Sequence, residues 1–188
     1  MALRPIRFAA EADLILAIGT RLSDFTTASR SLFRTPSATL IQLNAAGFDA
    51  AKHGALPLIA DVRAGLQALD RALATWAAPA DWTAKARGLA AEWNETVTRT
   101  TASSNAVLPS DAEVLGAVNR AVSPRDVIVC AAGGLPGELH KLWRCREVGT
   151  YHVEYGYSCM GYEIAGGLGV KLACPTARSG CWSVTALI

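Results

Sequence analysis

The stretch Tyr151–Leu172, YHVEYGYSCMGYEIAGGLGVKL, decides the fold class of this chain. Its crowded Tyr, Ser, Cys, Met and Gly residues predict a turn that leads into a helix over Gly161–Leu172, where the glycines allow close packing. Ahead of it, the apolar run Val127–Ala131 predicts a buried parallel strand that ends in the Ala-Ala-Gly-Gly of Ala131–Gly134. A glycine-rich strand end followed by such a turn is typical of an α/β sheet and makes this edge of the sheet a candidate anion site.

The glycine-rich loop Gly133–Gly137 is the clearest candidate anion site. Successive backbone N–H groups of such a loop converge, and the N-terminus of a following helix adds positive potential. We expect the loop to be flexible and the helix after it to cover Glu138–Trp143. A tight turn without a ligand accounts for the same residues, so the loop alone leaves both interpretations open.

Three short apolar runs in the first third of the chain predict a second parallel sheet. They are Asp13–Ile18, Thr39–Leu43 and Leu56–Ala60, and Pro57 predicts an edge position for the third. Asp61 is a suitable N-cap for a helix over residues 62–76, whose leucines recur at helical spacing. Strands that alternate with helices predict a Rossmann-like arrangement, and we interpret residues 1–76 as the C-terminal part of such a domain.

Residues 77–108 are predicted to form a helical connector, with a helix over Trp82–Thr98. A new unit begins at Pro109, because Ser110 and Glu113 have the spacing of a capping box at the start of a helix over residues 112–122. We assign residues 109–175 to this second unit.

Composition excludes several classes of protein. The chain has 188 residues, 51% of them hydrophobic, and a net charge of +2 without a basic stripe, so nucleic acid is not an expected partner. No run approaches the about 18 apolar residues of a membrane-spanning helix. The cysteines occur singly, which predicts reduced thiols and a cytoplasmic location; they are Cys130, Cys145, Cys159, Cys174 and Cys181.

Few side chains stand out as catalytic. His53 is expected at the surface, whereas His140 and His152 flank the glycine-rich loop and are placed to touch a substrate. Cys159 is a candidate nucleophile, but no base is identifiable and packing explains it equally well. Three glutamates are candidate acid or base groups, with solvated or helix-capping roles as the alternative: Glu138, Glu154 and Glu163.

Two blocks of the sequence resemble thiamine diphosphate enzymes. Residues 12–27, 39–54 and 56–69 are similar to the second half of the central domain of that superfamily. GGLPGELHKLW at Gly133–Trp143 and the block Tyr151–Ala173 are similar to the start of its diphosphate-binding domain. Within the superfamily, the resemblance is nearest to the trihydroxycyclohexane-dione acylhydrolases (decyclizing), C–C bond hydrolases of myo-inositol catabolism.

The resemblance implies a thiamine diphosphate site with magnesium as a second cofactor. Gly133, Gly134 and Leu135 would lie beside the diphosphate. Ser158, Cys159, Met160 and Gly161 would hold the aminopyrimidine ring, with the Met160 side chain supporting the bent cofactor. It further implies a polyol-derived dione as substrate and a homo-oligomeric parent enzyme.

The resemblance also implies what the chain lacks. The activating glutamate of the family would lie before Met1, so the catalytic residues are unknown. The Gly-Asp-Gly motif that holds magnesium is missing, because the chain reads TARSGCWSVTALI after Pro175, and we assign no metal ligands. We interpret residues 176–188 as a frameshifted tail, since a neighbouring reading frame can encode a strand followed by Gly-Asp-Gly.

The sequence therefore predicts an α/β fragment: a partial Rossmann-like domain followed by the truncated start of a thiamine diphosphate-binding domain. The leading hypothesis is a piece of a C–C bond hydrolase that is inactive alone. Two alternatives stay open: a fragment of an acetolactate-synthase-like carboligase or lyase, and a non-catalytic Rossmann-like binding module.

Overall fold

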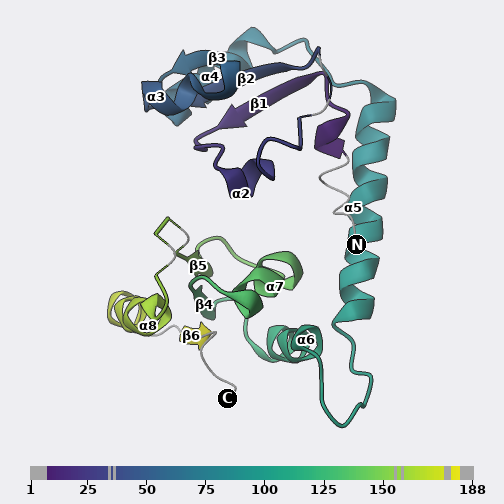
Figure 1. The fold of residues 1–188 in the computed structure, drawn as a ribbon, viewed down its shortest axis with the longest axis vertical. Coiled ribbons are helices and arrows are strands. Elements are labelled where there is room, and N and C mark those ends of the chain that lie inside the picture. Colours follow the sequence, from purple (N-terminus) through teal and green to yellow (C-terminus); the bar gives the residue numbers. More distant parts are fainter. Residues whose placement is uncertain are drawn as a thin grey trace. The chain divides into compact units, whose positions relative to one another are not determined.

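The computed structural model describes residues 8–33, 35, 37–154, 156–157 and 159–175, and the backbone of residues 179–182 (Figure 1). The chain forms two compact units, Met1–Trp93 and Asn94–Ile188. The boundary between them falls inside the expected connector, within the long helix α5 (Ala80–Thr100).

Unit 1 contains the predicted parallel sheet. Strands β1 (Leu14–Ile18), β2 (Thr39–Asn44) and β3 (Leu56–Ile59) pair in the order β1-β2-β3. The three expected strands are thus confirmed, and Pro57 lies on an edge strand because proline cannot donate to a ladder on both sides. On β1, Leu14, Leu16 and Ile18 remain 54%, 37% and 37% exposed, so one face of this strand is only partly covered.

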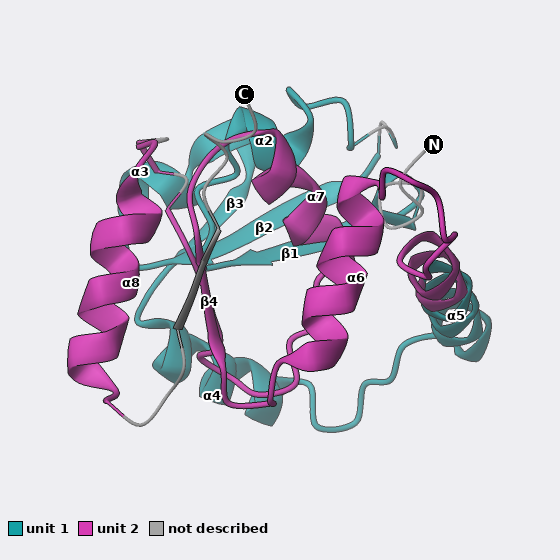
Figure 2. Ribbon diagram, turned by 90° about the horizontal axis from the view of Figure 1, so that it is seen from below, with its two compact units in different colours: residues 1–93 teal, residues 94–188 magenta. Residues whose placement is uncertain are grey.

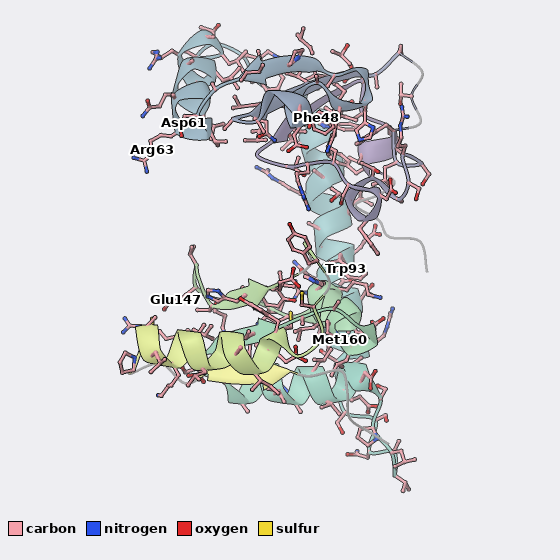
Figure 3. All side chains as sticks on the ribbon, turned by 60° about the vertical axis from the view of Figure 1, so that its left-hand side comes forward. Phe48, Asp61, Arg63, Trp93, Glu147 and Met160 are labelled. Atoms are coloured by element: carbon pink, nitrogen blue, oxygen red, sulfur yellow. The ribbon has the colours of Figure 1, made fainter. Side chains whose placement is uncertain are left out.

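Short helices and one longer helix surround this sheet. They are α2 (Asp24–Thr27), α3 (Gly47–Ala50), the 3₁₀ turn Lys52–Gly54 and α4 (Val62–Ala72). Asp61 caps α4 as predicted, because its carboxylate accepts from the Ala64 N–H at 3.0 Å. The helix ends earlier than the expected residue 76. Asp61 and Arg63 mark its start in Figure 3.

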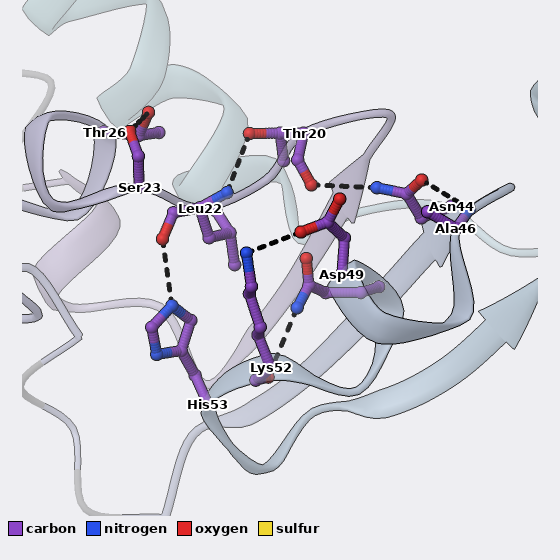
Figure 4. A network of polar contacts seen from close by, with 10 residues as sticks. Thr20, Leu22, Ser23, Thr26, Asn44, Ala46, Asp49, Lys52 and His53 are labelled. Atoms are coloured by element: carbon purple, nitrogen blue, oxygen red, sulfur yellow. Dashed lines mark hydrogen bonds and ion pairs between the residues drawn. The ribbon is translucent and has the colours of Figure 1, made fainter. Parts of the chain in front are cut away.

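Polar side chains tie together the loops at the carboxyl ends of β1 and β2 (Figure 4). The Asn44 amide donates to the Thr20 carbonyl at 3.0 Å, and the His53 Nε2 atom lies 2.9 Å from the Leu22 carbonyl. His53, expected at the surface, is therefore half-buried and bonded to backbone. These bonds satisfy backbone carbonyls that would otherwise lack a partner.

Unit 2 begins with the end of α5 and then α6 (Asp111–Ala121). The capping box is confirmed: the Ser110 hydroxyl accepts from the Glu113 N–H, and the Glu113 carboxylate accepts from the Ser110 N–H at 2.8 Å. Bonds from Ser104 and Ser110 lower the Glu113 pKa to about 2, so this cap stays charged at neutral pH.

The second sheet is also parallel, with the order β5-β4-β6. Its strands are β4 (Val127–Cys130), β5 (Tyr151–Val153) and β6 (Ser179–Trp182). Helix α7 (Gly134–Leu142) joins β4 to β5, and α8 (Tyr162–Ala173) lies between β5 and β6 in sequence. Because these two connections run in opposite directions across the sheet, α7 and α8 cover opposite faces of β4 (Figure 2).

One prediction needs correction here. The loop Gly133–Gly137 is not a flexible loop over its length, because α7 already begins at Gly134 and continues through Pro136. Proline is tolerated in the first turn of a helix, where its missing N–H has no partner to lose. Strand β5 was not predicted, and β6 falls inside the segment interpreted as a shifted tail.

Gly116 allows α6 to approach the end of α5 closely. A Cβ atom there would lie 2.3 Å from the Thr101 carbonyl oxygen and 2.5 Å from the Thr101 Cβ atom. Backbone cannot yield as a flexible side chain would. The contact therefore requires glycine.

We predict that Gly116→Ala lowers the free energy of unfolding of unit 2 by about 1–3 kcal/mol through overpacking. Gly169 in α8 is the matched control, since a Cβ there meets nothing within 4 Å. Gly169→Ala should raise stability by about 0.5–1 kcal/mol because alanine favours helix. Urea denaturation followed by tryptophan fluorescence measures both, and changes of the same sign would contradict this packing.

Candidate functional site

The first candidate loop follows the buried strand β4. Gly133 is the N-cap of α7 with φ of 145°, a conformation that strongly favours glycine. A Cβ at Gly134 would meet nothing within 4 Å, so the backbone at the start of α7 borders open space. The first-turn N–H groups of a helix have no intrahelical acceptor and carry partial positive charge. Gly133, Gly134 and Leu135 therefore form a backbone surface suited to a phosphate group.

The second candidate loop follows β5 and precedes α8. Cys159, Met160 and Gly161 lie at the entrance to α8, and Gly161 adopts φ of 90° as its N-cap. The Met160 side chain is 77% exposed, although it is large and apolar (Figure 3). Ser158, the fourth residue predicted to hold the aminopyrimidine, lies outside the described residues.

Glu154 fixes this second loop. One carboxylate oxygen accepts from the Tyr157 N–H at 2.7 Å, and the other accepts from the Cys159 N–H at 2.8 Å. Hydrogen bonds from Tyr157 and then Cys159 hold the pKa of Glu154 below its ordinary value. Glu154 was expected as an acid or base, or in a solvated or helix-capping role; the structure instead shows it bonded to backbone amides of the loop ahead of α8.

The sheet order brings the two loops to one edge. β4 and β5 are parallel neighbours, so the loops that follow them emerge from the same edge of the sheet. The chain passes from β4 to β5 on one side and then returns past β4 to β6 on the other side. Ligands of open α/β sheets bind outside the carboxyl ends of the strands where the connections diverge in this way. The site predicted from sequence therefore coincides with the position that the topology favours.

A chain of polar side chains runs beneath this edge. The fully buried Cys130 thiol donates to the Tyr151 hydroxyl at 3.3 Å, and that oxygen lies 3.2 Å from the His140 Nδ1 atom. Burial raises the Cys130 pKa and lowers the His140 pKa, which favours a thiol and a neutral imidazole. When the Tyr151 hydroxyl accepts from Cys130 and donates to His140 Nδ1, that nitrogen is the acceptor, and the neutral imidazole carries its proton on Nε2.

Among the described residues, the other candidates make no hydrogen bond to this arrangement, although the Glu163 charge also raises the pKa of the Cys130 thiol. The His152 Nε2 atom lies 3.1 Å from the Gly149 carbonyl oxygen, and Glu138 pairs with Lys141 at 2.6 Å on the surface of α7. Glu163 is 2% exposed and accepts from the Gly161 N–H at 3.1 Å, so it caps α8. Sequence reasoning missed the part played by Tyr151; its place in an unpredicted strand left no pattern to find it by.

Within the described part of the chain, no three His, Cys, Asp or Glu side chains are grouped to hold a metal ion. A search of the same residues finds no helix long and apolar enough to cross a membrane.

Comparison with known proteins identifies both units. Residues 5–69 match the central domain of thiamine pyrophosphate enzymes, and residues 131–185 match their C-terminal thiamine pyrophosphate-binding domain. The second match spans both candidate loops.

Curated relatives share one name, 3D-(3,5/4)-trihydroxycyclohexane-1,2-dione hydrolase. The Geobacillus thermodenitrificans protein is 41% identical over an alignment of 188 positions. This alignment covers 89% of this chain and 29% of that protein. The Bacillus anthracis protein is 37% identical over an alignment of 193 positions, which covers 89% of this chain and 30% of that protein. A Bacillus cereus protein, hydrolase 2 of the same name, is 35% identical, with the same two shares. The chain thus spans about three tenths of the length of these relatives.

We predict that Glu154→Ala accelerates hydrogen exchange of the Tyr157 and Cys159 amides relative to the wild-type chain, because both lose their acceptor. The pKa of Glu154 in the folded state lies below the ordinary glutamate pKa of 4.5. The stabilisation that its carboxylate gives the loop is therefore complete above pH 4.5, and it is lost as the pH falls through the folded-state pKa. The ratio of variant to wild-type exchange rates, measured by NMR, should therefore shrink in acid. A ratio of one at neutral pH would contradict the two hydrogen bonds to Glu154.

We predict that Tyr151→Phe lowers the free energy of unfolding by about 1–2 kcal/mol, since the buried Cys130 thiol and His140 lose a partner. The depressed pKa of His140 means that the unfolded state binds its proton more readily. The contribution of neutral His140 to the free energy of unfolding is therefore complete above its ordinary pKa of 6.5, and it falls as the pH drops through the folded-state pKa. Urea denaturation across this pH range tests both statements, with His140→Gln expected to flatten the dependence.

Proposed function

The chain belongs to the thiamine pyrophosphate enzymes, and from that membership we propose that it forms part of a hydrolase that opens a cyclic trihydroxy-dione at a carbon–carbon bond. The observation that carries the proposal is the placement of two loops. Gly133–Leu135 and Cys159–Gly161 lie after neighbouring parallel strands, inside the region that matches the cofactor-binding domain. The name shared by the relatives supports the choice of substrate and reaction.

The described residues fit the cofactor at two places. The exposed backbone at Gly133 and Gly134 would bind the diphosphate, since helix-start N–H groups donate to phosphate oxygens. The exposed Met160 side chain would lie against the flat thiazolium and pyrimidine rings, since a flexible, polarisable thioether packs favourably against aromatic rings. Glu154 would keep the Cys159 segment in place without touching the cofactor.

When bound, thiamine pyrophosphate supplies a carbon nucleophile that the side chains of a protein lack. The part of this chain is to bind and orient it, and to keep the Cys130 thiol protonated and inert beneath the edge. We propose magnesium as the ion that accompanies the diphosphate, with ligands other than the described side chains.

The remaining features of the proposal concern the whole enzyme. We propose a polyol-derived dione as substrate, a homo-oligomer as the active form and the cytoplasm as its location. The partly uncovered β1 face supports the homo-oligomer, because exposed apolar surface is commonly covered by a partner. The singly spaced cysteines support the cytoplasm.

A chimera tests the proposed reaction. In the Geobacillus thermodenitrificans hydrolase, the matching segment is replaced by that of this chain, and cofactor binding is first verified by circular dichroism. We expect ring opening of the trihydroxy-dione that depends on thiamine pyrophosphate, and no acetolactate from pyruvate. A chimera that binds the cofactor but leaves the dione intact, or that makes acetolactate, would contradict the hydrolase assignment.

A further inference from the structure

Unit 2 contains a cavity that the cofactor-binding edge does not use. It has a volume of about 510 Å³ and lies between the end of α5, helix α6 and the end of α7. A volume of this size is within the range of small-molecule sites, roughly 300–1,000 Å³. None of the residues of the two candidate loops lines it.

Two arginine side chains, Arg120 and Arg144, line this cavity. Arg120 donates through Nη1 to the Thr101 carbonyl at 3.0 Å, and Arg144 donates through Nη1 to the Asn94 side-chain oxygen at 2.6 Å. Arg144 is thereby held by α5, and Arg120 by Thr101, the residue that follows this helix. Each has five N–H donors, and the bonds made within the described residues leave several of them for a ligand.

The positive charge of these arginines is not neutralised locally. The cavity wall contains no aspartate or glutamate, and neither arginine has a carboxylate partner among the described side chains. The C-terminus of a helix carries only about half a negative charge. Arg146 already caps α6, through the carbonyls of Asn119 and Val122. The two full positive charges of Arg120 and Arg144 therefore exceed the partial negative charge of the helix C-termini nearby, and the cavity is positive.

The rest of the wall is mixed in character. Thr98, Ser103 and Asn119 contribute hydroxyl and amide groups, whereas buried Val97 and Leu142 contribute an apolar floor. Such a wall suits a compact polyol that carries an oxyanion, because guanidinium binds carboxylate and phosphate through paired hydrogen bonds.

We propose that this cavity is a second binding site, specific for a small polyol oxyanion such as a sugar acid or a sugar phosphate. The proposal goes beyond the proposed function, since the cavity is lined by residues that neither bind nor position the thiamine cofactor. A ligand there contacts α5, α6 and α7 at once, and so links the occupancy of the cavity to the stability of the helix that begins at the cofactor loop.

Calorimetric titration of the 188-residue chain tests the site, with glucuronate, glucose 6-phosphate and neutral glucose as probes. Both anions should bind at least about tenfold more tightly than glucose, the factor that corresponds to one charge-assisted hydrogen bond. The tighter of the two anions identifies carboxylate or phosphate as the preferred group. Equal affinity for glucose, or no binding of either anion at millimolar concentrations, would overturn the proposal.

A matched pair of variants locates the binding. Thr98 lies in the cavity wall and Thr100 does not, while both are exposed residues of α5. Thr98→Glu places a competing carboxylate beside the guanidinium groups and should weaken anion binding by about tenfold or more. Thr100→Glu adds the same charge outside the wall and should change affinity less than about twofold. Equal losses in the two variants would refute the cavity as the site.

Discussion

The parallel pairing of β4 with β5 on one side and β6 on the other governs where the loops of unit 2 lie. All four residues of β4 are buried, so this strand cannot shift without moving apolar side chains into water. Since the connections on its two sides run in opposite directions, α7 and α8 diverge across the sheet (Figure 2). Ligands of open α/β sheets bind at the carboxyl ends of such strands, and at the start of α7 a Cβ on Gly134 would meet nothing within 4 Å.

Local chemistry made much of the fold predictable. Asp61, Ser110 and Glu113 are capping residues whose hydrogen bonds depend on positions three residues away, and Pro57 excludes a central strand by removing a donor. The strand of three residues at Tyr151 was missed because it is too short for a period of two to show. The start of α7 was placed late because glycines suggest a loop, whereas here Gly133 serves as an N-cap and Gly134 lies in the first turn.

The candidate site was predictable only in part. Gly133–Leu135 and Cys159–Gly161 stood out by residue type, and the resemblance to thiamine diphosphate enzymes gave them roles. What holds them is less visible in sequence. Glu154 bonds to two backbone amides of the loop that it precedes, and Tyr151 joins a thiol on one strand to an imidazole on a helix. The Glu154 bonds are local, to amides three and five residues further along the chain, but no pattern of residue types indicates them. The Tyr151 contacts depend on tertiary positions that no spacing specifies. The cavity beside Arg120 and Arg144 likewise arises from three helices that are separate in sequence.

The central claim is that one sheet edge, at the ends of β4 and β5, binds thiamine pyrophosphate. Titration of the isotope-labelled chain with thiamine pyrophosphate and magnesium, followed by backbone amide NMR, tests it residue by residue. The account predicts saturable shifts in two groups of amides, Gly133–Leu135 and Cys159–Gly161, which follow a single binding curve. Shifts confined to other residues, or the absence of shifts in both loops at saturating cofactor, would contradict it.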